Sequence, residues 1–198
     1  METIANSLTE YYIRKNIIPC DKKEIFAYGF KLIIADIINF SIVILLSLII
    51  NRLLDGLVFL ITLCSIRQFS GGFHANTFWM CRLSMIITFC CVIASSSLLA
   101  NNIDTIIIII INAVCVTVIG ILSPIKHTNK SLTVQQQQKN KRNAIIISLF
   151  FFVISSVFAI MGIYEGVTIS ITLAAVVVLM IIGIAAQKGG NGNVGLAQ

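Results

Sequence analysis

Long uninterrupted runs of apolar residues alternate with short polar segments along the whole chain. Several of the runs approach or exceed the roughly 18–20 residues that a helix needs to cross a bilayer. The runs cover about 25–50, 53–66, 83–100, 103–122, 144–164 and 167–186. A helix in a soluble core would present a polar face, and these runs carry few polar residues. The pattern predicts an all-α, polytopic membrane protein with about six transmembrane helices.

The first 21 residues follow a different pattern. Ile4, Leu8, Tyr11 and Tyr12 fall at i, i+4, i+7 and i+8, so they share one face of a helix, and charged residues surround them. Such a helix lies in the membrane interface rather than across the bilayer. We therefore expect an interfacial amphipathic helix in 1–21 that ends at Pro19, and we expect no cleavable signal peptide.

Composition supports the membrane assignment. The chain has 198 residues, of which 58% are apolar and 11% are charged, whereas a soluble domain carries about 25% charged residues. We expect residues 1–198 to form a single membrane-embedded domain. Its Gly- and Asn-rich tail, 187–198, predicts disorder.

The basic residues predict the orientation. If six spans place both termini on one side, that side carries thirteen of the fourteen Lys and Arg residues, and Arg52 alone falls on the other. Such asymmetry places the basic side in the cytoplasm. The main soluble loop, 125–143, follows Ser123-Pro124 and is rich in Lys and Gln. It would be cytoplasmic, as would the polar stretch 67–82.

That polar stretch holds the candidate chemistry. An arginine stands at each end, Gly71-Gly72 and His74 lie inside it, and Cys81 follows His74 by seven residues. A thiol attacks only as a thiolate, and a free cysteine is mostly protonated at neutral pH. A histidine within hydrogen-bond reach can take the proton. The combination indicates cysteine chemistry at a membrane surface.

The spacing sets a geometric condition. Seven residues of straight helix would place His74 and Cys81 on one face but about 10.5 Å apart along the axis. Direct proton transfer therefore requires the chain to bend between them, which we expect around Asn76-Thr77. Chance pairing of a His and a Cys near a loop is the competing interpretation.

Supporting groups can be named only as candidates. The backbone amides of Gly71 and Gly72, or the side chain of Gln68, could stabilise an oxyanion. Asp36 lies inside the first span and could orient His74, or it could pair with Lys31 or another base for packing. Arg67, Lys126 and Lys130 are candidates for binding an acidic substrate or anionic lipid, although positive-inside charge explains most of this bias by itself.

The other cysteines are scattered. No CxxC pair and no metal-type Cys/His spacing occurs, so we expect neither a metal nor a cofactor. Most cysteines lie inside apolar runs, where cysteine behaves as a small hydrophobe.

These residues resemble a known family. The pattern Arg67-x-x-x-Gly71-Gly72-x-His74-x(6)-Cys81, set between spans of a basic protein of this length, is similar to the accessory gene regulator B (AgrB) family. Ser123-Pro124 opening a basic loop, with Asn129-Lys130 shortly after, is also similar to it. The likeness covers nearly the whole chain, and the Gly-Gly-x-His step to Cys81 is its most specific part.

The resemblance implies a membrane cysteine endopeptidase of quorum sensing, with His74 and Cys81 as the catalytic pair. It implies cleavage of the C-terminal tail of a linear, AgrD-like pro-peptide through an acyl thioester, followed by closure of a thiolactone or lactone ring. The expected partners are this peptide, the lipid bilayer and a second copy in a homodimer, with no nucleic acid.

Two other functions stay open from the residues alone. A non-enzymatic small-peptide transporter or channel would use Asp36 and Asn112 to line a path, but no internal repeat is visible. A thiol oxidoreductase would need paired cysteines, and the vicinal Cys90-Cys91 inside a span is a poor geometry for it. Asn112 is better explained as a packing residue between helices than as a site residue.

Overall fold

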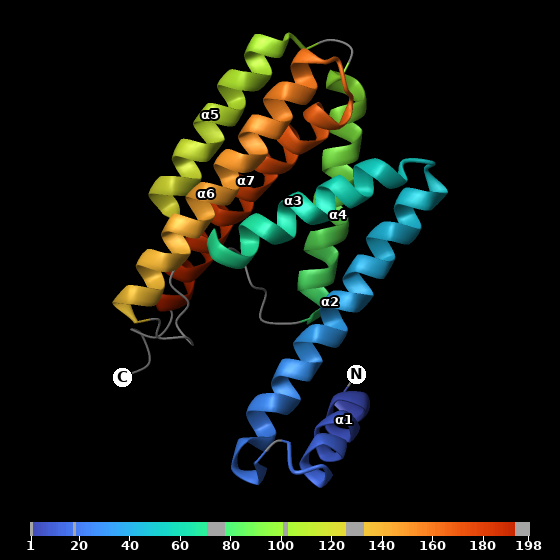
Figure 1. Cartoon of the computed structure of the whole chain (residues 1–198), viewed down its shortest axis with the longest axis vertical. Coiled ribbons are helices and arrows are strands. Elements are labelled where there is room, and N and C mark those ends of the chain that lie inside the picture. The colour runs from blue at the N-terminus through green and yellow to red at the C-terminus, as the bar shows by residue number, and fades with distance from the viewer. Residues whose placement is uncertain (1, 18, 71–77, 101–102, 126–132, 193–198) are drawn as a thin grey trace. The chain divides into compact units, whose positions relative to one another are not determined.

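The computed structural model describes residues 2–17, 19–70, 78–100, 103–125 and 133–192. In this part of the chain every regular element is a helix (Figure 1). A short 3₁₀ turn, Cys20–Lys22, precedes the second α-helix. The α-helices are α1 (Glu2–Arg14), α2 (Lys23–Ile49), α3 (Leu53–Ser70), α4 (Phe78–Leu99), α5 (Thr105–Leu122), α6 (Val134–Ile160) and α7 (Glu165–Gly192).

The predicted fold class is confirmed. Six of the described helices, α2 to α7, are long and apolar enough to cross a membrane. The shortest of them, α3 and α5, have 18 residues each, which corresponds to about 27 Å of helix against a hydrocarbon core of about 30 Å. Their order and positions agree with the six apolar runs.

The predicted soluble loop was too long. It was expected to cover 125–143, but α6 begins at Val134 and includes the polar run that contains Lys139 and Arg142. The cause is local. Thr133 caps the helix by accepting from the backbone N–H of Gln136, and the Gln136 side chain accepts from the Thr133 N–H. This reciprocal pair is a capping box, and the Gln, Lys and Arg residues that follow favour helix.

The two ends of the chain also differ in detail from the sequence expectation. α1 ends at Arg14 rather than at Pro19, and Asn16 follows with a φ of 55°, a left-handed conformation that Asn tolerates. At the other end, α7 continues to Gly192. Disorder of the tail therefore stays a prediction only for 193–198, which lie outside the described residues.

The chain divides into two compact units, Met1–Leu46 and Ser47–Gln198. In the first unit, α1 runs antiparallel to the first turns of α2. Lys31 Nζ lies 2.6 Å from Glu2 Oε1, and Lys23 Nζ lies 3.2 Å from Glu10 Oε1. The rings of Tyr12 and Phe30 also stack, with their centroids 5.6 Å apart. Two ion pairs and one aromatic contact hold α1 against α2.

In the second unit, α7 is the central helix. It contacts α3, α4, α5 and α6, while α5 and α6 also contact each other (Figure 1). Ile108 of α5, Ala159 of α6 and Val167 of α7 form one buried apolar cluster. Asn112 is fully buried and donates a 2.9 Å hydrogen bond to Ser155 Oγ, which in turn donates to the Gly166 carbonyl. Asn112 therefore joins α5 to α6, as expected of a packing residue.

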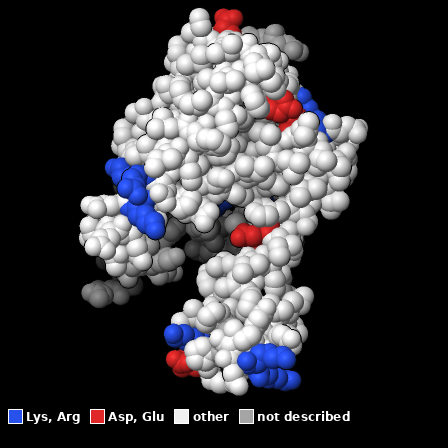
Figure 2. Space-filling model, viewed as in Figure 1, with Lys and Arg blue, Asp and Glu red and all other residues white. Residues whose placement is uncertain are grey.

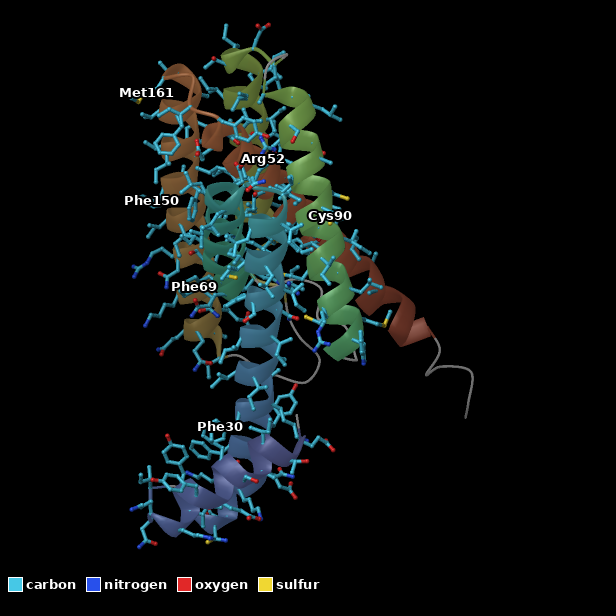
Figure 3. All side chains as sticks on the ribbon, turned by 90° about the vertical axis from the view of Figure 1, so that its right-hand side faces the viewer. Phe30, Arg52, Phe69, Cys90, Phe150 and Met161 are labelled. Carbon is cyan, nitrogen blue, oxygen red and sulfur yellow. The ribbon has the colours of Figure 1, made fainter. Side chains whose placement is uncertain are left out.

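A polar cluster ties one end of the second unit together. Arg52, in the turn between α2 and α3, packs its guanidinium 4.2 Å from the Tyr164 ring centroid and donates to the Ser97 hydroxyl. The Tyr164 hydroxyl donates a 3.0 Å hydrogen bond to Ser96 Oγ. Figure 3 labels Arg52 within this group of side chains. The cluster connects the α2–α3 turn, the end of α4 and the turn before α7.

The outer faces of the helices are apolar. Phe150 and Met161 are exposed and project from α6 away from the neighbouring helices (Figure 3). Exposed Ile and Leu residues continue this surface on α4 and α5. In Figure 2 long stretches of the surface between the helix ends carry no charged side chain. An exposed surface of this kind is what lipid covers in a membrane protein.

Candidate functional site

Cys81 is the fourth residue of α4. Its side chain is half-buried, and its sulfur forms no disulfide. Because α4 begins at Phe78, Cys81 stands in the first turn of a helix that is long and apolar enough to cross a membrane. Among the cysteines that the structure describes, Cys115 is buried within a span and Cys90 is exposed on the side of α4 (Figure 3).

The end of α3 supplies the next candidates. α3 continues to Ser70, so Arg67 and Gln68 both lie in its last turn. Arg67 is half-buried and Gln68 is exposed. Arg67 is therefore part of the helix rather than of the following segment, and its long side chain can extend from an apolar stem to a polar end.

The same end of the second unit receives the segment after α5. The backbone N–H of Ile125 donates a 3.1 Å hydrogen bond to the Ser70 carbonyl, and both residues are buried. Ser70 is the last described residue before 71–77, and Ile125 is the last before the basic stretch 126–132. The distribution of charge predicts both stretches on one side of the membrane, but nothing in the sequence indicates the hydrogen bond between Ile125 and Ser70.

Several predicted site residues lie outside the described residues. His74, Gly71 and Gly72 fall in 71–77, and Lys126 and Lys130 fall in 126–132. The predicted bend around Asn76-Thr77 lies there as well. These assignments therefore stay predictions.

Asp36, the remaining candidate, lies on α2 in the first unit and is exposed. Its role as an orienting group stays a prediction too. Lys31, its suggested packing partner, donates to Glu2 of α1.

One interaction beside Cys81 is absent from the expectations drawn from the sequence. The guanidinium of Arg82 lies over the Trp79 ring, with its Cζ atom 4.9 Å from the ring centroid. Trp79 and Arg82 are three residues apart on α4, a spacing that brings side chains together on a helix. The signal was present in the sequence, because an Arg three residues after a Trp at a helix start predicts this cation–π contact.

Comparisons with known proteins show what the sequence is similar to. The accessory gene regulator B family model matches residues 1–184, nearly the whole chain. Over 72 residues, the chain is 36% identical to an AgrB-like protein of Clostridium perfringens strain 13; the alignment covers 36% of this chain and 34% of the relative. Over 84 residues, it is 29% identical to protein FsrB of Enterococcus faecalis, covering 39% and 35% of the two chains.

The alignments with these curated relatives span about a third of their length. No solved structure gives a significant match. The family assignment therefore rests on the match that covers 1–184.

Proposed function

Because this chain belongs to the accessory gene regulator B family, which is linked to quorum sensing, we propose that it is a membrane-embedded cysteine endopeptidase. Its substrate is a linear, AgrD-like autoinducer pro-peptide. It removes the C-terminal tail of this peptide through an acyl thioester on Cys81 and promotes closure of a thiolactone or lactone ring.

One observation carries the proposal. Cys81 stands in the first turn of α4, half-buried at the end of a span, inside the region that the family model matches. A nucleophile at this height can meet a peptide that lies along the membrane surface. A cysteine in the middle of a span, such as Cys115, could not be reached by such a peptide without entering the apolar layer.

The proposal keeps the geometric condition that the spacing sets. Seven residues of straight helix would hold His74 and Cys81 about 10.5 Å apart along the axis, too far for direct proton transfer. A bend of the chain between the two residues is therefore part of the proposal, and the backbone freedom of Gly71-Gly72 would allow it.

The reaction then proceeds in two displacements. His74 takes the proton of the Cys81 thiol, and the thiolate attacks the scissile carbonyl carbon. The Gln68 amide or the amides of Gly71 and Gly72 donate hydrogen bonds to the oxyanion. The C–N bond breaks, His74 gives the proton to the leaving amine, and the tail departs. The acyl group stays on sulfur as a thioester.

A thiol or hydroxyl of the peptide itself attacks this thioester in the second displacement. His74 takes its proton, the bond to Cys81 breaks, and the proton returns to the sulfur. Water would compete for the thioester, so a site at the edge of the apolar layer favours ring closure over hydrolysis. Attack within one molecule also gains from proximity, with effective molarities that reach about 10⁵–10⁸ M in well-oriented cases.

Binding and orientation complete the proposal. Arg67, Lys126 and Lys130 are the proposed contacts for acidic residues of the peptide. The site and both termini face the cytoplasm, as the distribution of basic residues favours. A homodimer is proposed on the family resemblance alone.

The test is processing of a synthetic pro-peptide by the purified protein in lipid vesicles. Cys81→Ala and His74→Ala should each abolish tail release while the protein still inserts. Cys90→Ala, on the same helix, is the matched control and should process normally. Mass spectrometry should detect the acyl group on Cys81. Tail release by Cys81→Ala would overturn the proposal and would favour a contaminating protease.

A further inference from the structure

Trp79 is the single tryptophan of the chain, and it lies in the first turn of α4 with 75% of its surface exposed. Leu83 and Ile87 follow it at i+4 and i+8 and are also exposed, at 57% and 53%. Residues at this spacing lie on one face of a helix. Because α4 is long and apolar enough to cross a membrane, we expect lipid to cover this face, and Trp79 stands at the end of the exposed row.

Arg82 lies against Trp79 and can interact further. Its guanidinium covers the indole ring, and its Nε atom is buried with no hydrogen-bond partner among the described residues. A guanidinium presents five N–H donors in a planar fork, and since Nε is buried, the N–H groups of the two terminal nitrogens are the ones offered to a phosphate. The apolar stem of an arginine can lie along a lipid-facing helix while its charged end extends to the headgroups.

We propose that Trp79 and Arg82 form an interfacial anchor that binds a phospholipid headgroup. The indole lies at the level where aromatic residues collect at membrane interfaces, and the guanidinium holds the phosphate of an adjacent lipid. Cys81 lies between the two residues in the chain, so the anchor fixes its height relative to the bilayer. The inference deepens the proposed function, because it states what holds the nucleophile at the membrane surface.

Two properties of the pair favour a lipid over a protein group as the occupant. The row below Trp79 is apolar and exposed as far as Ile87, which is continuous with the surface that lipid covers. The guanidinium also lies against the exposed ring, with Cζ 4.9 Å from the ring centroid, so a lipid that covers the ring comes close to the positive charge. A lipid whose acyl chains contact Leu83 and Ile87 would place its phosphate near Trp79 and Arg82, at the end of the row.

The single tryptophan makes the anchor directly measurable. The wild-type protein is placed in phosphatidylcholine vesicles that carry a quencher near the carbonyl end or near the methyl end of the acyl chain. We expect the shallow quencher to reduce Trp79 fluorescence at least about twofold more than the deep one. Equal quenching, or stronger quenching by the deep probe, would overturn the proposal.

Variants test the role of Arg82. In Arg82→Gln the ratio of shallow to deep quenching should fall by about twofold, because the contact with the phosphate is lost. In Arg82→Lys the ratio should fall less, because the positive charge remains. Arg142→Gln, an equal charge change at an exposed site on α6, should leave the ratio unchanged. An unchanged ratio in Arg82→Gln, or an equal fall in Arg142→Gln, would overturn the proposal.

A measurement on the wild-type chain covers the case in which Arg82→Gln does not fold. Vesicles of digalactosyl diacylglycerol form bilayers without phosphate, so the wild-type ratio should fall in them as it does for the variant. A ratio that stays the same would show that no phosphate is bound. These depth measurements need no peptidase activity. The anchor can therefore be overturned while the proposed function holds, and the proposed function can be overturned while the anchor holds.

The consequence for Cys81 is read from its labelling. Maleimide modification of each cysteine in wild-type protein is located by mass spectrometry after digestion. Arg82→Gln should slow labelling of Cys81 several-fold, because the helix end sinks toward lipid, and should leave the exposed Cys20 unchanged as an internal reference. An unchanged labelling rate of Cys81 would show that Arg82 does not control the exposure of this thiol, and it would overturn that part of the proposal.

Discussion

The Thr168 hydroxyl donates a 2.8 Å hydrogen bond to Asp55 Oδ1, and the two residues are 113 positions apart in the chain. The other oxygen of Asp55 lies 3.4 Å from Arg52 Nε. Asp55 is only 6% exposed, so its carboxylate is held from two sides in a buried position. This arrangement links α3 to α7 at the end of the second unit that carries the Arg52 and Tyr164 contacts.

Removing either partner of this hydrogen bond should destabilise the protein. Asp55→Ala leaves Arg52 without its carboxylate, and breaking a buried pair in this way costs about 3–5 kcal/mol. Thr168→Val removes only the donor and should cost about 1–3 kcal/mol. Thermal unfolding of the purified protein in detergent should show the larger fall in Tm for Asp55→Ala. A double variant that loses the sum of both effects would show that the residues do not interact.

Two glycines should respond in opposite directions to the same substitution. In Gly56→Ala the new Cβ would lie 1.8 Å from Ser47 Oγ, so α3 would have to move away from the end of α2, at a cost of about 1–3 kcal/mol. In Gly29→Ala the Cβ meets nothing within 4 Å, and the helix should gain up to about 1 kcal/mol. The measurement is the Tm of each variant. A stabilised Gly56→Ala would contradict the close approach.

The contact between α1 and α2 should depend on pH. The hydrogen bond from Lys31, with its positive charge, holds the pKa of Glu2 below its usual value. A carboxyl whose pKa is lower when folded contributes stability above its usual pKa and loses it as the pH falls through the folded value. Carbon NMR titration of the glutamate carboxyls should show this low pKa for Glu2. It should return to the usual value in Lys31→Gln.

If Gln68 donates to the oxyanion, its removal should affect catalysis without affecting binding. Gln68→Ala should lower kcat by about 10²–10³ and leave KM nearly unchanged, because this donor acts on the transition state. Since Gln68 is exposed at the end of α3, the variant should unfold at the wild-type temperature. Processing at the wild-type rate would leave the amides of Gly71 and Gly72 as the donors.

Hydropathy was sufficient to place the six spans, because a backbone in lipid must satisfy its hydrogen bonds internally and an apolar run therefore becomes a helix. It was insufficient at α6. The residues 134–143 are mostly polar, so hydropathy predicts a loop there, although Thr133 and Gln136 carry the capping signal three residues apart. Local helix propensity and capping extend a helix past the membrane where hydropathy alone ends it.

Contacts between distant residues could not be predicted from the sequence. Nothing near Asp55 indicates that Thr168 is its partner, and nothing near Ser70 indicates Ile125. These pairings depend on which helices pack together, and small and polar residues suit many packings equally well. The candidate pair His74 and Cys81 was identified from residue type and family pattern, and only Cys81 lies in the part of the chain that the structure describes.

The polar start of α6 changes how its positive charges are presented. The ten residues from Val134 to Asn143 form about 15 Å of helix rather than a flexible loop. Lys139 and Arg142 are three residues apart and share one side of this helix, while Lys141 faces elsewhere. A binding partner must therefore match a fixed arrangement of two positive charges. Moving either charge by one position along the helix would place it on a different face.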